Sequence, residues 1–136
     1  MAIPPQGHAP AGAQQAPLTV LLVEDDLLIR AHATDMLREL GHRVIEAEYG
    51  PDALAVLQAE PVDVLVTDVG LPGMSGPMLA TRARDVQPGI GVVFATGHDE
   101  LPPDERAEHA DAVLLLKPYD AAGLADSLRR ALPVRA

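Results

Sequence analysis

The sequence predicts an α/β fold in which helices cover both faces of one five-stranded parallel sheet, the doubly wound arrangement. Five short apolar segments alternate with segments whose apolar residues recur at helical spacing. Strands that alternate with helices in this way form parallel sheets with right-handed crossovers. Four of the apolar segments also end in polar or charged residues, as strands do where a sheet opens onto a binding edge. These observations predict the fold class before any single motif is considered.

The first strand is expected at residues 18–23, and a helix follows it. Apolar residues at helical spacing predict this helix, and they are Ile29, Ala33, Met36, Leu37 and Leu40. Gly41 supplies its stop signal. Residues 42–47 then alternate between polar and apolar, which favours an edge strand over a central one.

The middle of the chain repeats the pattern. Pro51 opens a second helix, and an apolar strand at residues 62–67 leads into Asp68 and a loop rich in Pro and Gly. The apolar positions of the second and third helices are Ala53, Leu54 and Leu57, then Met78, Leu79, Ala83 and Val86. Pro88 ends the third helix.

The last third contains strands at residues 90–95 and 112–116 and a fifth helix. Between Thr96 and Ala112 the pattern weakens, because residues 104–110 offer a core only alanines. The fourth helix is therefore expected to be short or mobile. The fifth helix carries Leu124, Ala125, Leu128 and Leu132.

Length, composition and charge limit the function classes. A chain of 136 residues with 48% apolar content suits one domain, expected at residues 18–134, after a disordered tail at residues 1–17 that lacks periodicity. A net charge of -10 argues against nucleic acid or an anionic membrane as a direct partner, since both require a basic face. The chain has no cysteine, no signal peptide pattern and no apolar stretch long enough to span a membrane. The expected compartment is the cytoplasm.

The polar residues at the strand ends predict a phosphoryl-transfer site. Glu24, Asp25, Asp68, Thr96 and Lys117 would share the carboxyl edge of the sheet. Carboxylates brought close together either take up protons or bind a hard cation, and Mg²⁺ prefers oxygen ligands. Asp68 could then attack phosphorus while the Lys117 ammonium and the Thr96 hydroxyl stabilise the transferring group. The product would be an aspartyl phosphate.

In this order and spacing, the motifs resemble those of the response-regulator receiver domain of two-component signalling. The matching segments are Leu21-Leu22-Val23-Glu24-Asp25-Asp26, Thr67-Asp68-Val69-Gly70-Leu71-Pro72-Gly73-Met74-Ser75-Gly76, Ala95-Thr96-Gly97 and Leu116-Lys117-Pro118-Tyr119. The resemblance implies that Asp68 is the phosphoacceptor and that Thr96 and Lys117 assist it. It also implies that Glu24, Asp25, Asp68 and the Gly70 carbonyl bind Mg²⁺.

The resemblance further implies a flavodoxin-like strand order of 2-1-3-4-5 and a cis Lys117-Pro118 peptide bond. The implied partners are a histidine kinase or histidine phosphotransfer protein and a downstream protein target. The segment Phe94-Ala95-Thr96-Gly97 is partly similar to a receiver subgroup marked by Phe-Ala-Thr-Gly, although His98-Asp99 follow here.

Other interpretations remain open at this point. A haloacid-dehalogenase-like hydrolase also uses a strand-end Asp, but it needs a second acid two residues later, where this chain has Gly70. A degenerate receiver that is never phosphorylated is the other alternative. Asp26 is expected to cap the first helix, Lys117 and Thr96 could be ordinary surface and strand-end residues, and the five histidines are interpreted as solvated or structural.

One departure from the receiver pattern suggests a different output switch. Receivers commonly carry Tyr or Phe three residues before the lysine, and this chain has Leu114 there. We therefore hypothesise that phosphorylation acts by ordering residues 97–110 around Thr96, since leucine cannot perform the ring rotation of the usual switch.

Overall fold

The computed structural model describes residues 16–97 and 101–132. Within them, five parallel strands form one sheet in the order β2-β1-β3-β4-β5. The strands are β1 (Thr19–Val23), β2 (Arg43–Ala47), β3 (Val64–Asp68), β4 (Gly91–Thr96) and β5 (Val113–Leu116). The predicted fold class, strand order and edge position of residues 42–47 are confirmed.

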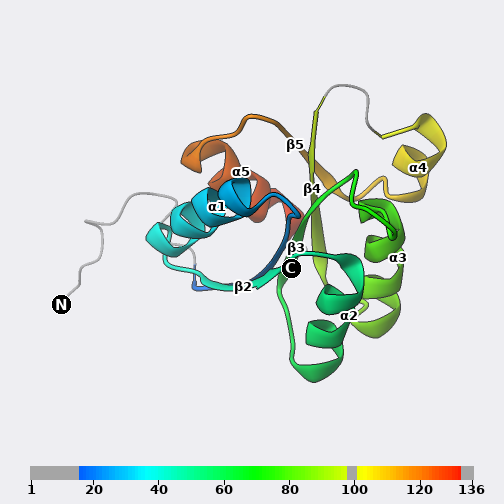
Figure 1. Cartoon of the computed structure of the whole chain (residues 1–136), viewed down its shortest axis with the longest axis horizontal. Helices are drawn as coiled ribbons and strands as arrows, with labels where there is room; N and C mark the ends of the chain where they lie inside the picture. The colour runs from blue at the N-terminus through cyan, green and yellow to red at the C-terminus, as the bar shows by residue number, and fades with distance from the viewer. Residues whose placement is uncertain (1–15, 98–100, 133–136) are drawn as a thin grey trace.

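The helices alternate with the strands and cover both faces of the sheet (Figure 1). They are α1 (Leu27–Glu39), α2 (Gly50–Ala59), α3 (Gly76–Val86), α4 (Pro103–Glu108) and α5 (Ala121–Ala131). The expected strand boundaries shift by one or two residues. Asp68, expected just after its strand, is the last residue of β3, so the strand itself fixes its backbone.

Each face of the sheet has its own apolar core because successive strand residues point to opposite sides. Leu21 and Val23 of β1 pack with α2 and α3, whereas Val20 and Leu22 pack with α1 and α5. Phe94 is fully buried on the α2–α3 side. The strands are therefore held from both faces, which gives the residues at their ends fixed positions.

Two helices near the carboxyl edge begin at side-chain caps. The Asp26 carboxylate accepts hydrogen bonds from the N–H groups of Leu28 and Ile29 at 2.9 and 3.0 Å, which confirms its predicted capping role. Ser75 caps α3 in the same way through the N–H of Met78. Both caps stand directly after strand-end loops, so they fix where those loops turn into helix.

Helix α4 is the weakest element of the fold. It has six residues and none of them is buried, as the lack of apolar positions predicted. Leu101 before the helix and His109 after it are each 4% exposed. His109 lies edge-on against Phe94, and its ring nitrogens contact Thr81 and Arg84 of α3. Helix α4 thus contacts the core of the domain through the buried residues that precede and follow it.

Some expectations fall outside the described residues. The proposed tail at residues 1–17 is described only from Ala16 onward, and residues 133–134 of the proposed domain are likewise outside. Residues 98–100, within the segment expected to become ordered on phosphorylation, are also outside.

Candidate functional site

The carboxyl edge of the sheet brings the predicted acidic residues together. Residues 24 and 25 follow β1, and Asp68 ends β3, the strand paired with β1. One carboxylate oxygen from each of Glu24, Asp25 and Asp68 lies within 4.8 Å of the other two. Among the His, Cys, Asp and Glu residues in the described part of the chain, these three carboxylates form a group close enough to share one metal ion.

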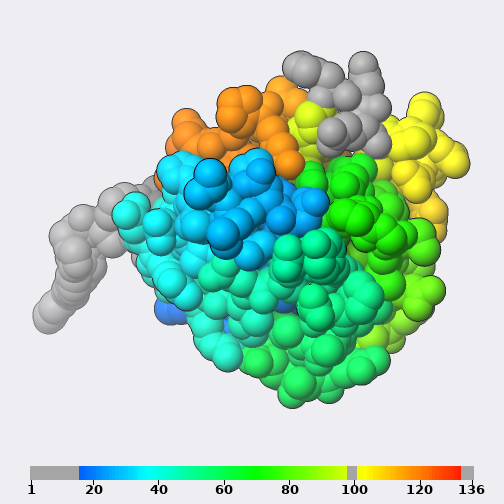
Figure 2. Space-filling view, viewed as in Figure 1, coloured from blue at the N-terminus to red at the C-terminus, as the bar shows by residue number. Residues whose placement is uncertain are grey.

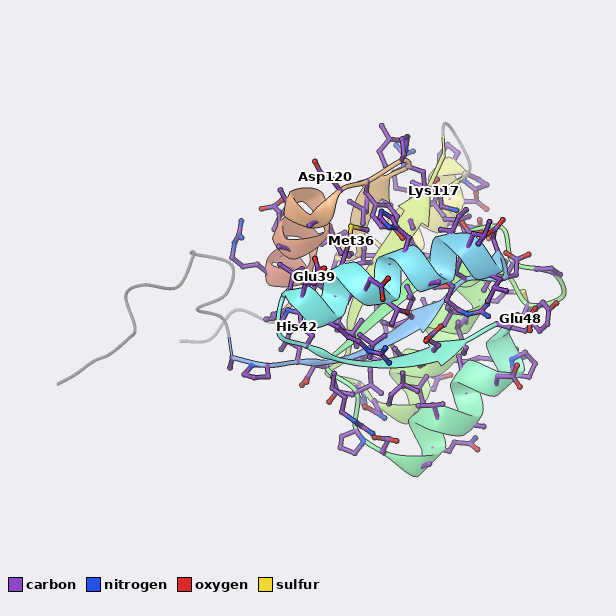
Figure 3. The ribbon with its side chains drawn as sticks, turned by 60° about the vertical axis from the view of Figure 1, so that its left-hand side comes forward. Met36, Glu39, His42, Glu48, Lys117 and Asp120 are labelled. Carbon is purple, nitrogen blue, oxygen red and sulfur yellow. The ribbon has the colours of Figure 1, made fainter. Side chains whose placement is uncertain are left out.

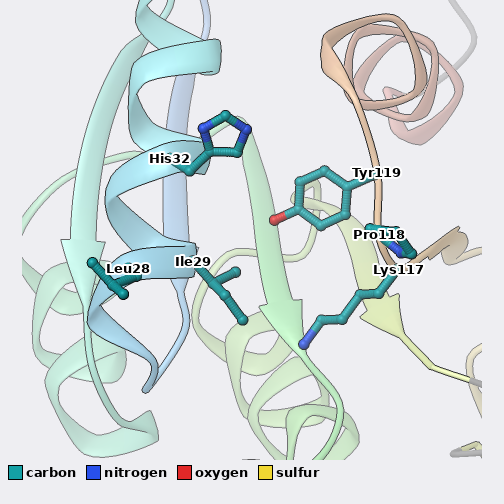
Figure 4. A pocket seen from close by; sticks show the side chains of 6 residues that line it. All are labelled: Leu28, Ile29, His32, Lys117, Pro118 and Tyr119. Carbon is teal, nitrogen blue, oxygen red and sulfur yellow. The ribbon is translucent and has the colours of Figure 1, made fainter.

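Lys117 reaches this cluster from the end of β5. Its ammonium nitrogen lies 2.7 Å from Asp68 Oδ1 and 3.4 Å from Glu24 Oε1. Figure 4 shows the side chain extending from β5 across the ends of the strands, and Figure 3 shows Lys117 and His42 at opposite ends of the sheet. The Lys117-Pro118 peptide bond is cis, as expected.

The surroundings of Glu24 and Lys117 shift the pKa values of both side chains. Burial raises the pKa of Glu24, and the nearby Asp68 carboxylate raises it further, against the lowering effect of the Asp26 N–H and Lys117. Burial lowers the pKa of Lys117, but the hydrogen bond and charge of Asp68, together with Glu24, outweigh that effect and raise it. The ammonium is therefore held charged beside two carboxylates at neutral pH.

Thr96 and Gly70 lie at the same edge in different settings. Thr96 is 6% exposed, and its hydroxyl donates a hydrogen bond to the Gly97 carbonyl at 2.9 Å. The Lys117 N–H donates to the Thr96 carbonyl at 2.9 Å, so the two residues are coupled through the backbone. Gly70 is exposed in the loop after Asp68, and a Cβ there would meet no atom within 4 Å.

Two further residues shape the site and were not singled out from the sequence. Gly76, the first residue of α3, packs its Cα so tightly against the Asp68-Val69 peptide that a Cβ would overlap it. Arg30 on α1 donates from Nη1 to the Glu24 carbonyl at 2.6 Å and from Nε to Glu46 Oε1 at 3.2 Å. The only sequence signal for Arg30 is its place one turn after Asp26, which puts it on the site side of α1.

Comparisons with known proteins agree with this geometry. The family profile of the response regulator receiver domain matches residues 20–129. The chain is 35% identical over 115 residues to the response regulator receiver protein CpdR of Brucella abortus, an alignment that covers 83% of this chain and 95% of CpdR. The chain belongs to the response-regulator receiver family.

Two other similar proteins support the assignment of this chain to the receiver family. The Brucella abortus sensor kinase CckA is 34% identical over 84% of the chain, but the match spans 12% of that longer protein. The crystal structure of the Vibrio cholerae chemotaxis protein CheY4 superimposes with a TM-score of 0.77 at 27% identity, covering 86% of this chain and 100% of that one. The receiver is a signalling module that accepts a phosphoryl group in a two-component phosphorelay.

The donor set of the receiver fits the Mg²⁺ that this family generally binds. Three carboxylates converge, and one ammonium, from Lys117, contacts two of them, which leaves an excess of negative charge. The oxygen-only set at an open edge is the kind that Mg²⁺ occupies while keeping several waters. Gly70 carries no acid, so the second carboxylate that the hydrolase alternative requires is missing.

An apolar cleft of about 470 Å³ borders the site of the receiver. Its lining residues come from α1 and from the β5–α5 connection, and they are Leu28, Ile29, His32, Lys117, Pro118 and Tyr119 (Figure 4). Burial raises the pKa of Tyr119, and the charge of Glu24 adds to the effect. No helix in residues 16–97 and 101–132 is long and apolar enough to cross a bilayer.

Proposed function

We propose that Asp68 is the phosphoacceptor of this receiver and that Glu24, Asp25 and Lys117 form its immediate environment. The observation that supports this most strongly is the contact of 2.7 Å between the Lys117 ammonium and Asp68 Oδ1, beside two further carboxylates. A carboxylate fixed at a strand end next to a cation is suited to in-line attack on phosphorus.

The transfer forms one bond and breaks one. An oxygen of Asp68 attacks the phosphorus of a phosphohistidine, the P–N bond breaks, and its electron pair returns to the imidazole nitrogen of the donor. Negative charge stays on the phosphoryl oxygens, where the Lys117 ammonium, already 2.7 Å from Asp68, can interact with it. The Thr96 hydroxyl would donate a hydrogen bond to a phosphoryl oxygen in place of the Gly97 carbonyl that it now contacts.

Glu24, Asp25, Asp68 and the carbonyl of Gly70 would hold Mg²⁺. When bound, the ion supplies neutralising charge for the phosphoryl oxygens. Gly70 is an exposed residue in the loop directly after Asp68. Glu24 is 4% exposed whereas Asp25 is partly exposed, so Asp25 is the more solvent-accessible residue of the pair.

The phosphoryl donor is proposed to be a histidine kinase or histidine phosphotransfer protein that docks on the first turn of α1. Leu27, Leu28 and Ile29 are 65%, 79% and 40% exposed, an unusual run of apolar residues in contact with solvent. Figure 2 shows α1 in blue, the β5–α5 connection in orange and the β3–α3 loop in green meeting on one face. A donor seated there would bring its imidazole to Asp68, and the signal would then pass to a downstream protein by contact. The cytoplasm remains the predicted compartment.

Phosphorylation with two kinds of donor tests this proposal. With Mg²⁺ and acetyl phosphate, the chain should gain one base-labile phosphoryl group, and Asp68→Asn should abolish it. Asp85→Asn, the same change at an exposed acid of α3, is the matched control and should label normally. Unchanged labelling of Asp68→Asn would overturn the assignment, and loss of all labelling in the wild-type chain would favour the degenerate receiver.

The docking part of the proposal needs a protein donor. Leu28→Asp should slow transfer from a phosphohistidine-carrying domain that labels the wild-type chain, while labelling by acetyl phosphate stays unchanged. Val86→Asp, at an exposed apolar residue at the far end of α3, serves as the control. Equal transfer rates for Leu28→Asp and the wild type would refute docking on α1.

A further inference from the structure

The Arg30 guanidinium makes two contacts that connect α1 to the acidic loop and to β2. Its Nη1 donates to the backbone carbonyl of Glu24 at 2.6 Å, and its Nε lies 3.2 Å from Glu46 Oε1. The Arg30 side chain is 14% exposed, so the contacts are largely shielded from water. Charged donors in such settings form the stronger hydrogen bonds of a protein.

The Glu24 carbonyl belongs to the peptide that leads directly into Asp25. On its other side, the Glu24 N–H is held by the Ala47 carbonyl at 3.2 Å, and its carboxylate accepts from the Asp26 N–H at 3.1 Å. Asp26 in turn caps α1. The N–H and the carboxylate of Glu24 thus bond to other groups, and Arg30 contacts its backbone carbonyl.

We propose that Arg30 is a positioning residue for the metal-binding carboxylates of this receiver. By holding the Glu24-Asp25 peptide in one orientation, it directs the two acidic side chains toward Asp68. Arg30 touches none of the three clustered carboxylates through any contact in the described residues, so it acts through the backbone. The inference rests on the proposed roles of Glu24 and Asp25.

Charge and position predict opposite results when Arg30 is replaced. If Arg30 acted only as a nearby cation, its removal would leave the acidic cluster more negative, and Mg²⁺ would bind more tightly. If Arg30 orients the ligands, its removal lets the peptide rotate, and Mg²⁺ binds more weakly. Changes to residues that orient metal ligands typically cost about 10- to 100-fold in metal affinity.

Calorimetric titration of Mg²⁺ into the phosphate-free protein distinguishes these cases. We expect Arg30→Met to raise the dissociation constant about tenfold or more. Arg30→Lys keeps the charge but loses the planar fork, so it should resemble Arg30→Met rather than the wild type. Glu46→Gln keeps the contact to the Glu24 carbonyl and should have a smaller effect.

Matched controls separate positioning from general loss of structure. Arg43, the first residue of β2, pairs through Nη1 with Glu60 Oε1 and lies at the opposite end of the strand from the acidic cluster. Arg43→Gln should therefore leave Mg²⁺ affinity unchanged. In metal-free Arg30→Met, hydrogen exchange of the Asp26 amide should increase, since its acceptor Glu24 is no longer fixed. Melting temperatures of all variants show that each is folded during the titration.

Clear outcomes overturn the inference. Tighter or unchanged Mg²⁺ binding by Arg30→Met, or wild-type affinity in Arg30→Lys, would show that Arg30 acts only through its charge or not at all. At saturating Mg²⁺, Arg30→Met should still be labelled on Asp68 by acetyl phosphate. Mapping the phosphoryl group to another residue would contradict the proposed function instead, so the two failures are distinguishable.

Discussion

Replacing Gly76 by alanine tests how the start of α3 supports the end of β3, where Asp68 lies. A Cβ built on Gly76 would lie 3.0 Å from the Cα of Val69 and closer still to the carbonyl oxygen of Asp68. Carbon atoms in contact prefer a separation of about 3.5–4.0 Å, so the backbone must move by roughly 0.5 Å or more. No flexible side chain can absorb this shift, because the contacted atoms belong to the backbone.

The cost can be expressed in stability and in rate. Overpacking of this kind destabilises a protein by about 1–3 kcal/mol, which in urea corresponds to a fall of about 1 M in the unfolding midpoint for a typical small domain. The shift also displaces Asp68 from its partners, and small misplacements of reacting groups slow phosphorylation by about tenfold. Gly76→Ala should show both effects.

Urea unfolding followed by circular dichroism and labelling by acetyl phosphate measure the two effects. Gly89→Ala is the matched control, since a Cβ at Gly89 meets no atom within 4 Å and its φ lies outside the left-handed region. It should unfold at the same or a slightly higher urea concentration and accept phosphoryl normally. A Gly76→Ala variant with the midpoint and labelling rate of the wild type would refute the reasoning.

Two further predictions concern the ends of the sheet. Burial lowers the pKa of His42, whose Nδ1 accepts a hydrogen bond from the Leu18 N–H at 3.0 Å. The unfolded chain therefore binds a proton on His42 more readily than the folded protein does. The contribution of neutral His42 to the stability of the fold is lost as pH falls below about 6.5. His42→Gln should flatten the decline in unfolding free energy between neutral and mildly acidic pH, and an unchanged slope would disprove this role. Hydrogen exchange should slow chiefly within residues 97–110 when beryllofluoride binds, because α4 has no buried residue of its own; equal exchange in the free and bound states would reject the ordering switch.

Two residues show what the sequence alone could determine. Asp68 was identified because it follows an apolar strand and precedes a Pro/Gly loop, and Lys117 because it ends another strand before Pro118. Such local patterns are sufficient since parallel strands in one sheet must end at the same edge. The fold class and the convergence of Glu24, Asp25 and Asp68 followed from that rule, and the structure confirms both.

The tertiary structure decided how that edge is supported. Arg30 contacts the Glu24 carbonyl, Gly76 packs against the Asp68-Val69 peptide, and His109 is buried against Phe94. None of these contacts has a periodic or local signature, because each depends on the angle and depth at which a helix or loop packs against the sheet. Acidic residues and Lys117 at the strand ends have a local sequence signature, whereas the contacts of Arg30, Gly76 and His109 depend on how separate elements pack together, which only the tertiary structure decides.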